Sequence, residues 1–196
     1  MIKQINKKLE ETLMQVGLRI AKRGEGALFI VGKLKDYHTL VDQNVPPFNA
    51  IDNPKLLESL ALMDGAILIS KEGYVQAYGI MVKSKSTFKN FGTRHSAGLT
   101  ASYDGNTVFL ISEEDKKIRI IRDGKMIMQI DALQKNVEKS VPMAVNFLES
   151  IGAGTIGTIS TSILVPSLGI TFLPGVIIFG SAYYIGKLIK DRFHGN

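Results

Sequence analysis

Apolar residues near the start of the chain recur at spacings of three and four, which is the periodicity of one face of an α-helix. The positions are Ile2, Ile5, Leu9, Leu13, Val16 and Ile20. Arg23-Gly24 ends this pattern, so we predict an N-terminal amphipathic helix over residues 1–24. Its apolar face either packs on the chain's own domain or serves as a dimer or regulatory helix.

Short apolar runs separated by turn-forming residues follow this helix. Residues 27–31 (ALFIV) stand between two glycines and predict a buried strand. Residues 34–53 contain two prolines and several Asn and Asp, which predicts a loop. Asn53-Pro54 predicts a helix that runs to Asp64-Gly65, with Asn as the N-cap and Pro in the first turn. The side chains expected on its inner face are Leu56, Leu57, Leu60 and Met63.

Two β-hairpins, a helix and a further strand account for the next stretch. Lys71-Glu72-Gly73 and Asp123-Gly124 are turn sequences between apolar runs, and Asp-Gly is a strong hairpin signal. The strands predicted around these turns span residues 66–70, 74–81, 117–122 and 125–130. Between the hairpins, residues 93–102 predict a helix and residues 107–112 predict a strand.

Residues 132–140 predict one more helix, with Asp131 as its cap, and Pro142 predicts a link to the last part of the chain. Helices and strands are thus interleaved, and some strands are neighbours in sequence. This order is typical of an α/β fold in which a mixed β-sheet is flanked by helices.

The composition narrows the class of protein. The chain has 196 residues, of which 45% are hydrophobic and 21% are charged, and this excludes a disordered chain. Cys is absent, which excludes disulfides, thiolate zinc sites and a cysteine nucleophile. The net charge of +6 is modest and does not form a block of like charges, so we expect no nucleic-acid partner.

The apolar residues are concentrated near the C-terminus. Residues 150–186 contain no Asp, Glu, Lys or Arg, a run that a soluble domain of this size does not need. One continuous helix over this run would be roughly 55 Å long, nearly twice the thickness of a bilayer core, so it must break, most naturally at Pro166 and Pro174. We therefore predict a C-terminal membrane segment over residues 141–196, with lipid contacts through residues 150–186.

Three arrangements of this segment are possible. A helical hairpin would have arms near residues 147–165 and 170–188, whereas a single kinked span would cover residues 163–186. The third is a tail that is buried in protein or lies on the lipid surface. The basic residues within 187–196 favour a cytoplasmic C-terminus, and two passes would place the globular domain on the same side. The expected location is the cell membrane.

Three polar segments at the ends of predicted elements are candidates for chemistry. Asp64-Gly65-Ala66 (DGA) lies at the start of a strand. Gly65 would let a ligand or another backbone approach closely, and Asp64 could hold a metal ion or accept a proton. The same residues are also typical of a helix stop before a strand.

The second segment, residues 92–97 (GTRHSA), leads from a loop into a helix. The N-terminus of a helix offers unpaired N–H donors and the positive end of a dipole. With the hydroxyls of Thr93 and Ser96 and the guanidinium of Arg94, it would suit a phosphate group. The alternative is ordinary capping by Thr93 or Ser96, with Arg94 solvated and His95 structural.

The third segment, residues 112–115 (SEED), places acidic side chains at the end of a buried strand. A carboxylate there could complete a site for Mg²⁺ or Mn²⁺, because these ions favour oxygen ligands and nucleotide phosphates. A solvated turn is the alternative.

Together and in this order, DGAILISKEGYVQAYGI (residues 64–80), FGTRHSAGLTAS (91–102) and VFLISEEDKKIRIIRDGKM (108–126) resemble the diadenylate cyclase (DAC) domain. That domain is the catalytic module of the DNA integrity scanning proteins and of the membrane-bound cyclic di-AMP synthases. GALFIVG (26–32) resembles the first strand of the family. The resemblance implies a nucleotide-binding domain over residues 25–140.

The resemblance further implies an enzyme that joins two ATP molecules into cyclic di-AMP, releases two pyrophosphates and uses Mg²⁺ or Mn²⁺. Asp64 would activate the ribose 3′-hydroxyl, directly or through the metal ion, and Glu113 would lie near that ion. Arg94 and His95 would be the other catalytic residues. The residues implied to bind the nucleotide are Gly65, Ala66, Thr93, Arg94, His95 and Ser96.

The resemblance also carries an expectation about assembly and location. One active site holds one ATP and cannot close the ring, so two subunits must face each other in a homodimer or a larger homo-oligomer. A cytoplasmic nucleotide substrate would place the catalytic domain in the cytoplasm.

One residue departs from the family pattern. The best-known form of the phosphate-binding motif is Arg-His-Arg, whereas this chain has Ser96 at the third place, so one phosphate-binding cation is lost. The alternative to an active cyclase is therefore a catalytically weak or inactive nucleotide-binding or sensing module of the same fold.

Overall fold

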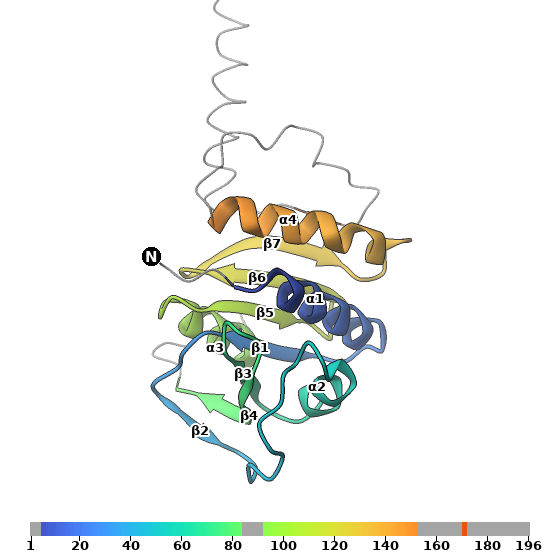
Figure 1. Cartoon of the computed structure of the whole chain (residues 1–196). Helices are drawn as coiled ribbons and strands as arrows, with labels where there is room; N and C mark the ends of the chain where they lie inside the picture. Colours follow the sequence, from blue (N-terminus) through green and yellow to red (C-terminus); the bar gives the residue numbers. More distant parts are fainter. Residues whose placement is uncertain (1–4, 84–91, 153–169, 172–196) are drawn as a thin grey trace, which may run out of the picture.

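The computed structural model describes residues 5–83, 92–152 and 170–171, which form a mixed β-sheet with helices on both faces (Figure 1). The strands are β1 (Ala27–Val31), β2 (Tyr37–Thr39), β3 (Ala66–Ile69), β4 (Val75–Val82), β5 (Thr107–Ile111), β6 (Lys117–Arg122), β7 (Lys125–Asp131) and β8 (Ile170–Thr171). The helices are α1 (Lys7–Lys22), α2 (Pro54–Ala61), α3 (Thr93–Ser102), the 3₁₀ helix η1 (Val137–Ser140) and α4 (Val141–Gly152). The strand order is β2-β4-β3-β1-β5-β6-β7-β8, which confirms the mixed α/β class.

The middle strand β1 explains why an uninterrupted apolar run predicted a buried strand. It pairs parallel with β3 and antiparallel with β5. Successive side chains of a strand point to opposite faces. Phe29 and Val31 belong to the core shared with α1, α2 and α4, whereas Leu28 and Ile30 belong to the core beneath α3. Both faces are covered, so both sets of positions are apolar.

Helix α1 is the predicted amphipathic helix, and it packs on the sheet of its own chain against β5 and β6. Asn6 caps it by accepting a hydrogen bond from the Lys8 N–H at 2.9 Å. The predicted apolar positions that are buried are Ile5, Leu9, Leu13, Val16 and Ile20. This packing supports the first of the two alternatives for the helix, and Ile2 lies outside the described residues.

Helix α2 begins at the predicted Asn53-Pro54 but ends one turn early, because the residues after it turn the chain into β3 through Gly65, whose φ is +98°. Leu57 and Leu60 are buried as predicted, whereas Leu56 is 37% exposed and lies on the outer side. The predicted loop before α2 also contains the short edge strand β2, which pairs with β4. Its side chains are exposed or half-buried, so no apolar pattern marks it.

Both predicted hairpins are present. β3 and β4 pair antiparallel across the turn at residues 71–73, and β6 pairs with β7 across Asp123-Gly124. Asp123 has a φ of 49° and Gly124 a φ of 68°. A two-residue hairpin turn with both central residues in the left-handed region matches the twist of the strands, which is why Asp-Gly is such a good signal.

The predicted helix over residues 132–140 is wrong. Asp131 accepts a hydrogen bond from the Leu133 N–H at 2.9 Å and so forms a turn instead of a helix cap. Asn136 then adopts a left-handed backbone with a φ of 63°, and only the 3₁₀ helix η1 follows. Pro142 is not a link either, because it lies in the first turn of α4, where its missing N–H costs no helical hydrogen bond.

Helix α4 packs against α1, and its buried side chains include Phe147 and Leu148. Lys7 at the start of α1 donates to the Asn146 side chain at 2.7 Å. Within the described part of the chain, no helix is both long and apolar enough to cross a bilayer. The predicted start of the membrane segment at residue 141 is wrong, because residues 141–152 form α4 in the core of the domain, and Ile170–Thr171 pair with β7 as β8. The rest of the segment, residues 153–169 and 172–196, lies outside the described residues, so its topology stays a prediction.

A buried ion pair joins α1, α4 and the sheet. The Arg122 guanidinium donates to Glu10 on α1 at 2.8 Å, to the Thr107 hydroxyl on β5 at 2.9 Å and to the Leu148 carbonyl on α4 at 3.3 Å. Removing one partner of such a pair leaves a buried charge uncompensated, which is strongly unfavourable. The Arg122 network therefore fixes both helices on one face of the sheet.

Candidate active site

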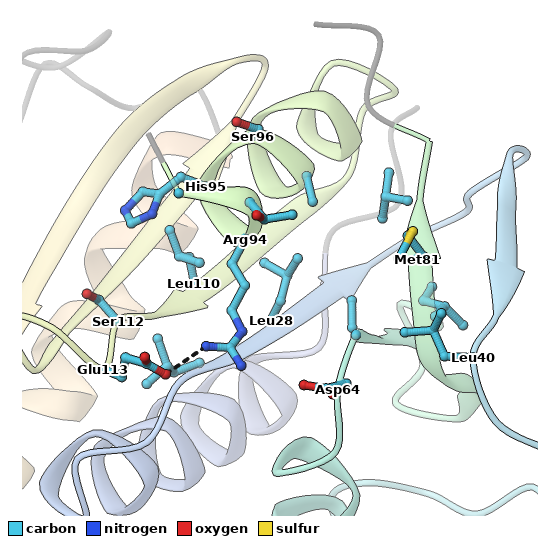
Figure 2. Close-up of a pocket in the computed structure, with 18 of the residues that line it drawn as sticks. Leu28, Leu40, Asp64, Met81, Arg94, His95, Ser96, Leu110, Ser112 and Glu113 are labelled. Carbon is cyan, nitrogen blue, oxygen red and sulfur yellow. Dashed lines mark hydrogen bonds and ion pairs between the residues drawn. The ribbon is translucent and has the colours of Figure 1, made fainter. Parts of the chain in front are cut away.

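A pocket of about 610 Å³ opens between the first turn of α3, the end of β5 and the β3–β4 pair (Figure 2). Its volume is within the usual range of small-molecule sites. The predicted site residues all line it: Asp64, Gly65, Ala66, Thr93, Arg94, His95, Ser96 and Glu113. The fold therefore brings three segments that are distant in sequence to one place.

Asp64 and Gly65 form the β3 side of the pocket, and Figure 2 shows Asp64 across from the α3 side that carries Arg94. Asp64 is exposed. Gly65 has a left-handed backbone, and a Cβ atom on it would lie 2.7 Å from the carbonyl oxygen of Ile80 on β4. The close approach of the two backbones at Gly65 thus fixes where the Asp64 carboxylate emerges.

The first turn of α3 brings hydrogen-bond donors to the pocket. Gly92 is the N-cap residue, and no side chain among the described residues caps the helix, so the alternative of capping by Thr93 or Ser96 is not observed. A helix N-terminus of this kind offers N–H donors and the positive end of a dipole to a phosphate group. Ser96 is only 5% exposed, so little of its side chain can reach a molecule in the pocket.

Arg94 reaches across the pocket to the third segment. Its Nη1 atom donates to Glu113 Oε2 at 3.0 Å (Figure 2), and the two side chains are 38% and 55% exposed. Glu113 follows β5, so the pair connects the helix to the end of a central strand. An ion pair this exposed contributes little stability. It uses one nitrogen of Arg94 and one oxygen of Glu113, which leaves donors for a phosphate and an oxygen for a metal ion.

His95 lies in the first turn of α3, and Figure 2 shows its side chain pointing away from that of Arg94. Burial and the nearby positive charge of Arg119 lower the pKa of His95, although Asp115 and Glu114 oppose the shift. His95 is therefore mainly neutral at pH 7. Burial alone would raise the pKa of Asp115, but hydrogen bonds from Arg119 and Ser112 outweigh it and lower the pKa to about 2. Asp115 is thus fully ionised and engaged with Arg119.

The apolar wall of the pocket escaped the sequence analysis. Leu40 and Met81 line it and are 42% and 45% exposed, and Leu28 and Leu110 lie deeper. An exposed Leu or Met is common on any surface, so neither residue carries a signal on its own. They come together because β2 pairs with β4, which only the folded chain shows.

Residues 17–126 match the family model described as DAC, DisA bacterial checkpoint controller nucleotide-binding. The chain belongs to the diadenylate cyclase domain family. The predicted membership of this family is thereby confirmed, and the matched residues include the DGA, GTRH and SEED segments. The match begins within α1 and ends within β7, so it includes the whole pocket.

Named relatives agree with the family. A diadenylate cyclase of Haloferax volcanii is 32% identical over 140 residues, which are 61% of this chain and 51% of that protein. The chain therefore spans about half the length of this relative. Two solved structures are similar with a TM-score of 0.47 each. One is a hypothetical membrane-spanning protein from Bacillus cereus, 22% identical over 58% of this chain and 59% of that one. The other is a double mutant of DacA from Staphylococcus aureus, 24% identical over 61% of this chain and 84% of that one.

The pocket of this diadenylate cyclase domain suits a metal ion that arrives with a nucleotide. Asp64 and Glu113 both line it and offer carboxylate oxygens, the ligands that Mg²⁺ and Mn²⁺ favour. Within residues 5–83 and 92–149, no cluster of three or more acidic or His side chains forms a ready-made metal site. Mg²⁺ is usually held by one or two carboxylates together with substrate phosphates, so this donor set fits.

Proposed function

We propose that this protein is a diadenylate cyclase, which joins two ATP molecules into cyclic di-AMP and releases two pyrophosphates. The observation that carries the proposal is the arrangement of the pocket, where the carboxylate of Asp64 stands across from Arg94 and the N-terminus of α3. Transfer of a nucleotidyl group needs positive groups around the phosphates and a carboxylate near the attacking hydroxyl. Membership of the family supports the same reaction.

In the proposed mechanism the ribose 3′-oxygen of one ATP attacks the α-phosphorus of the other. A new P–O bond forms, the bond to the pyrophosphate breaks, and Asp64 takes the hydroxyl proton. Arg94 and the N–H groups of the first turn of α3 hold the triphosphate and stabilise its charge in the transition state. Neutral His95 can donate a hydrogen bond to a phosphate oxygen. The protein contributes mainly positioning and electrostatic stabilisation.

A divalent metal ion, when bound, would supply further positive charge at the phosphates. Asp64 and Glu113 are the residues that would hold it. Glu113 pairs with Arg94 through one oxygen and one nitrogen. The other carboxylate oxygen would therefore bind the metal ion, and the other N–H groups of the guanidinium would bind a phosphate, while the ion pair is kept.

Closing the ring of cyclic di-AMP requires two such pockets. Each holds one ATP, so we propose that two copies of the domain face each other in a homodimer or a larger homo-oligomer. The reaction rate would then depend on protein concentration.

The direct test uses purified protein with ATP and Mg²⁺, Mn²⁺ or Co²⁺, with chromatography of the products. We expect cyclic di-AMP and pyrophosphate in a ratio of one to two. Tight binding of ATP without any cyclic di-AMP would instead mean a nucleotide sensor of the same fold, the function that the loss of a phosphate-binding cation at Ser96 favours.

We also propose that the apolar C-terminal segment tethers the domain to the cell membrane, with the catalytic domain in the cytoplasm. Residues 150–186 contain no Asp, Glu, Lys or Arg and are flanked by basic residues on their C-terminal side. Long uncharged runs of this kind partition into lipid.

The full chain is expected to stay in the membrane fraction through washing with high salt, because hydrophobic insertion is not screened by ions. A variant truncated after Gly152, which keeps the whole of α4, should be soluble and should retain ATP binding. Release of the full chain by salt would contradict insertion.

Reporters fused before Met1 and after Asn196 distinguish the two membrane topologies. Two reporters on the same side of the membrane would support two passes, whereas reporters on opposite sides would mean a single pass.

A further inference from the structure

Gly26, the residue before β1, lies directly beneath the Arg94–Glu113 ion pair. A Cβ atom on Gly26 would be 2.4 Å from Nη1 and 3.2 Å from Cζ of Arg94, and 3.3 Å from Oε2 of Glu113. The first distance is far shorter than any van der Waals contact. The guanidinium of Arg94 therefore occupies the space in which any other residue would carry its side chain.

The backbone conformation does not explain this glycine. The φ of Gly26 is outside the left-handed region, whereas Gly24, two residues earlier, has a φ of +83°. The φ of Gly26 therefore does not by itself exclude alanine. Gly26 does not line the pocket, so it does not touch a ligand there. The remaining explanation for a glycine at this position is that it leaves room for the side chain of Arg94.

We infer that Gly26 is a positioning residue for Arg94. A long Arg side chain at the pocket edge has many rotamers, and ordering it costs conformational entropy. The open backbone at Gly26 and the carboxylate of Glu113 confine the guanidinium before ATP binds, which lowers the entropic cost of binding. The inference rests on the proposed function only in that the group confined by Gly26 is the one that holds the triphosphate.

Gly26→Ala is the test, because the atoms that the new methyl group would meet are the far ends of flexible side chains and not backbone. The variant should fold, with a thermal midpoint within about 3 °C of the wild type. Arg94 should be displaced, and ATP should bind about tenfold more weakly or worse, as for the loss of a charge-assisted hydrogen bond. The affinity for adenosine, which has no phosphates and is measured by competition with ATP, should not change. Glu25→Gln, at the exposed neighbouring position, is the matched control and should bind ATP like the wild type.

A double-mutant cycle separates positioning from a general structural effect. In an Arg94→Ala background, Gly26→Ala should have no further effect on ATP binding. An equal loss in both backgrounds, or no loss in either, would overturn the inference. If Gly26→Ala does not fold, Gly26→Ala with Arg94→Ala must fold, because the space is then empty. Failure of both to fold would mean that something other than Arg94 excludes the methyl group.

The NMR signal of the Arg94 side-chain N–H, assigned by its loss in Arg94→Ala, gives a readout that needs no nucleotide. We expect Gly26→Ala to move it towards the position of a solvated arginine, and an unmoved signal would overturn the inference. Wild-type protein that forms no cyclic di-AMP would refute the proposed function and leave this result standing. Normal activity with an unmoved signal would refute the positioning role alone.

Discussion

Asp64→Asn is expected to lower the rate of cyclic di-AMP formation at least about a hundredfold, the contribution of a positioned general base. The substitution keeps the size of the side chain and removes only its charge and basicity. Asp64 is exposed at the entrance of β3, so no buried interaction is lost and the fold should be unchanged. ATP should still bind within about threefold of the wild type, as expected for a change at an exposed position. Product chromatography and ATP titration measure the two effects.

Asp52→Asn is the matched control, because it removes a carboxylate that is also exposed and that does not line the pocket. It should leave both the rate and ATP binding unchanged. A variant at Asp64 that forms cyclic di-AMP as fast as the wild type would exclude Asp64 as the base. Loss of ATP binding by the same variant would mean that the main role of Asp64 is to hold the metal ion or the substrate, and not to act as the base.

The elements that could be predicted from the sequence are those whose signals are local. The run of residues 27–31 predicted β1 because five consecutive apolar residues fit a strand covered on both faces, and the structure has helices on both faces. Asp123-Gly124 predicted a hairpin because the turn itself requires a left-handed backbone, and both residues have it. α1 was predicted from the helical spacing of its apolar residues, which can be seen without knowing which strands the helix packs on.

The chain after β7 could not be predicted from such signals. Asp131 is as good a start for an Asx turn as for a helix cap, and its use in a turn depends on residues further along. Pro142 is equally compatible with a link and with the first turn of a helix. Phe147 and Leu148 were assigned to the apolar tail because they adjoin the charge-free run, but in the structure they are buried in the core that α4 shares with α1.

Some features of the site could likewise be predicted from the sequence, and others could not. Its polar residues lie in three short contiguous segments, so the resemblance to the family was enough to name them. The contacts between segments depend on the sheet. Arg94 and Glu113 meet because α3 and the end of β5 are neighbours in space, and the room over Gly26 exists only once β1 lies beside β5. Neither the Arg94–Glu113 contact nor the space over Gly26 can be predicted from the pattern of apolar and polar residues.

Gly65→Ala is expected to destabilise the protein severely, by about 2–6 kcal/mol, the sum of backbone strain and overpacking. A Cβ atom on residue 65 would lie 2.7 Å from the carbonyl oxygen and 2.8 Å from the amide nitrogen of Ile80, and 2.8 Å from the carbonyl carbon of Gly79. These are backbone atoms of β4, which is held between β3 and β2 and cannot move aside cheaply. The free energy of unfolding in denaturant measures the loss, which is large beside a total stability of about 5–15 kcal/mol.

Gly105→Ala separates the two causes, because Gly105 also has a left-handed φ, +75°, but a Cβ atom there would meet nothing within 4 Å. This substitution should lower the free energy of unfolding by about 1 kcal/mol, the contribution of the backbone strain alone. Equal losses at the two positions would mean that β3 and β4 separate without cost, contrary to their packing. If β4 is as rigid as its neighbours imply, the methyl group at residue 65 must instead push the entrance of β3 away from β4. Asp64 would then move with it, so cyclic di-AMP formation should fall by more than the folded fraction does.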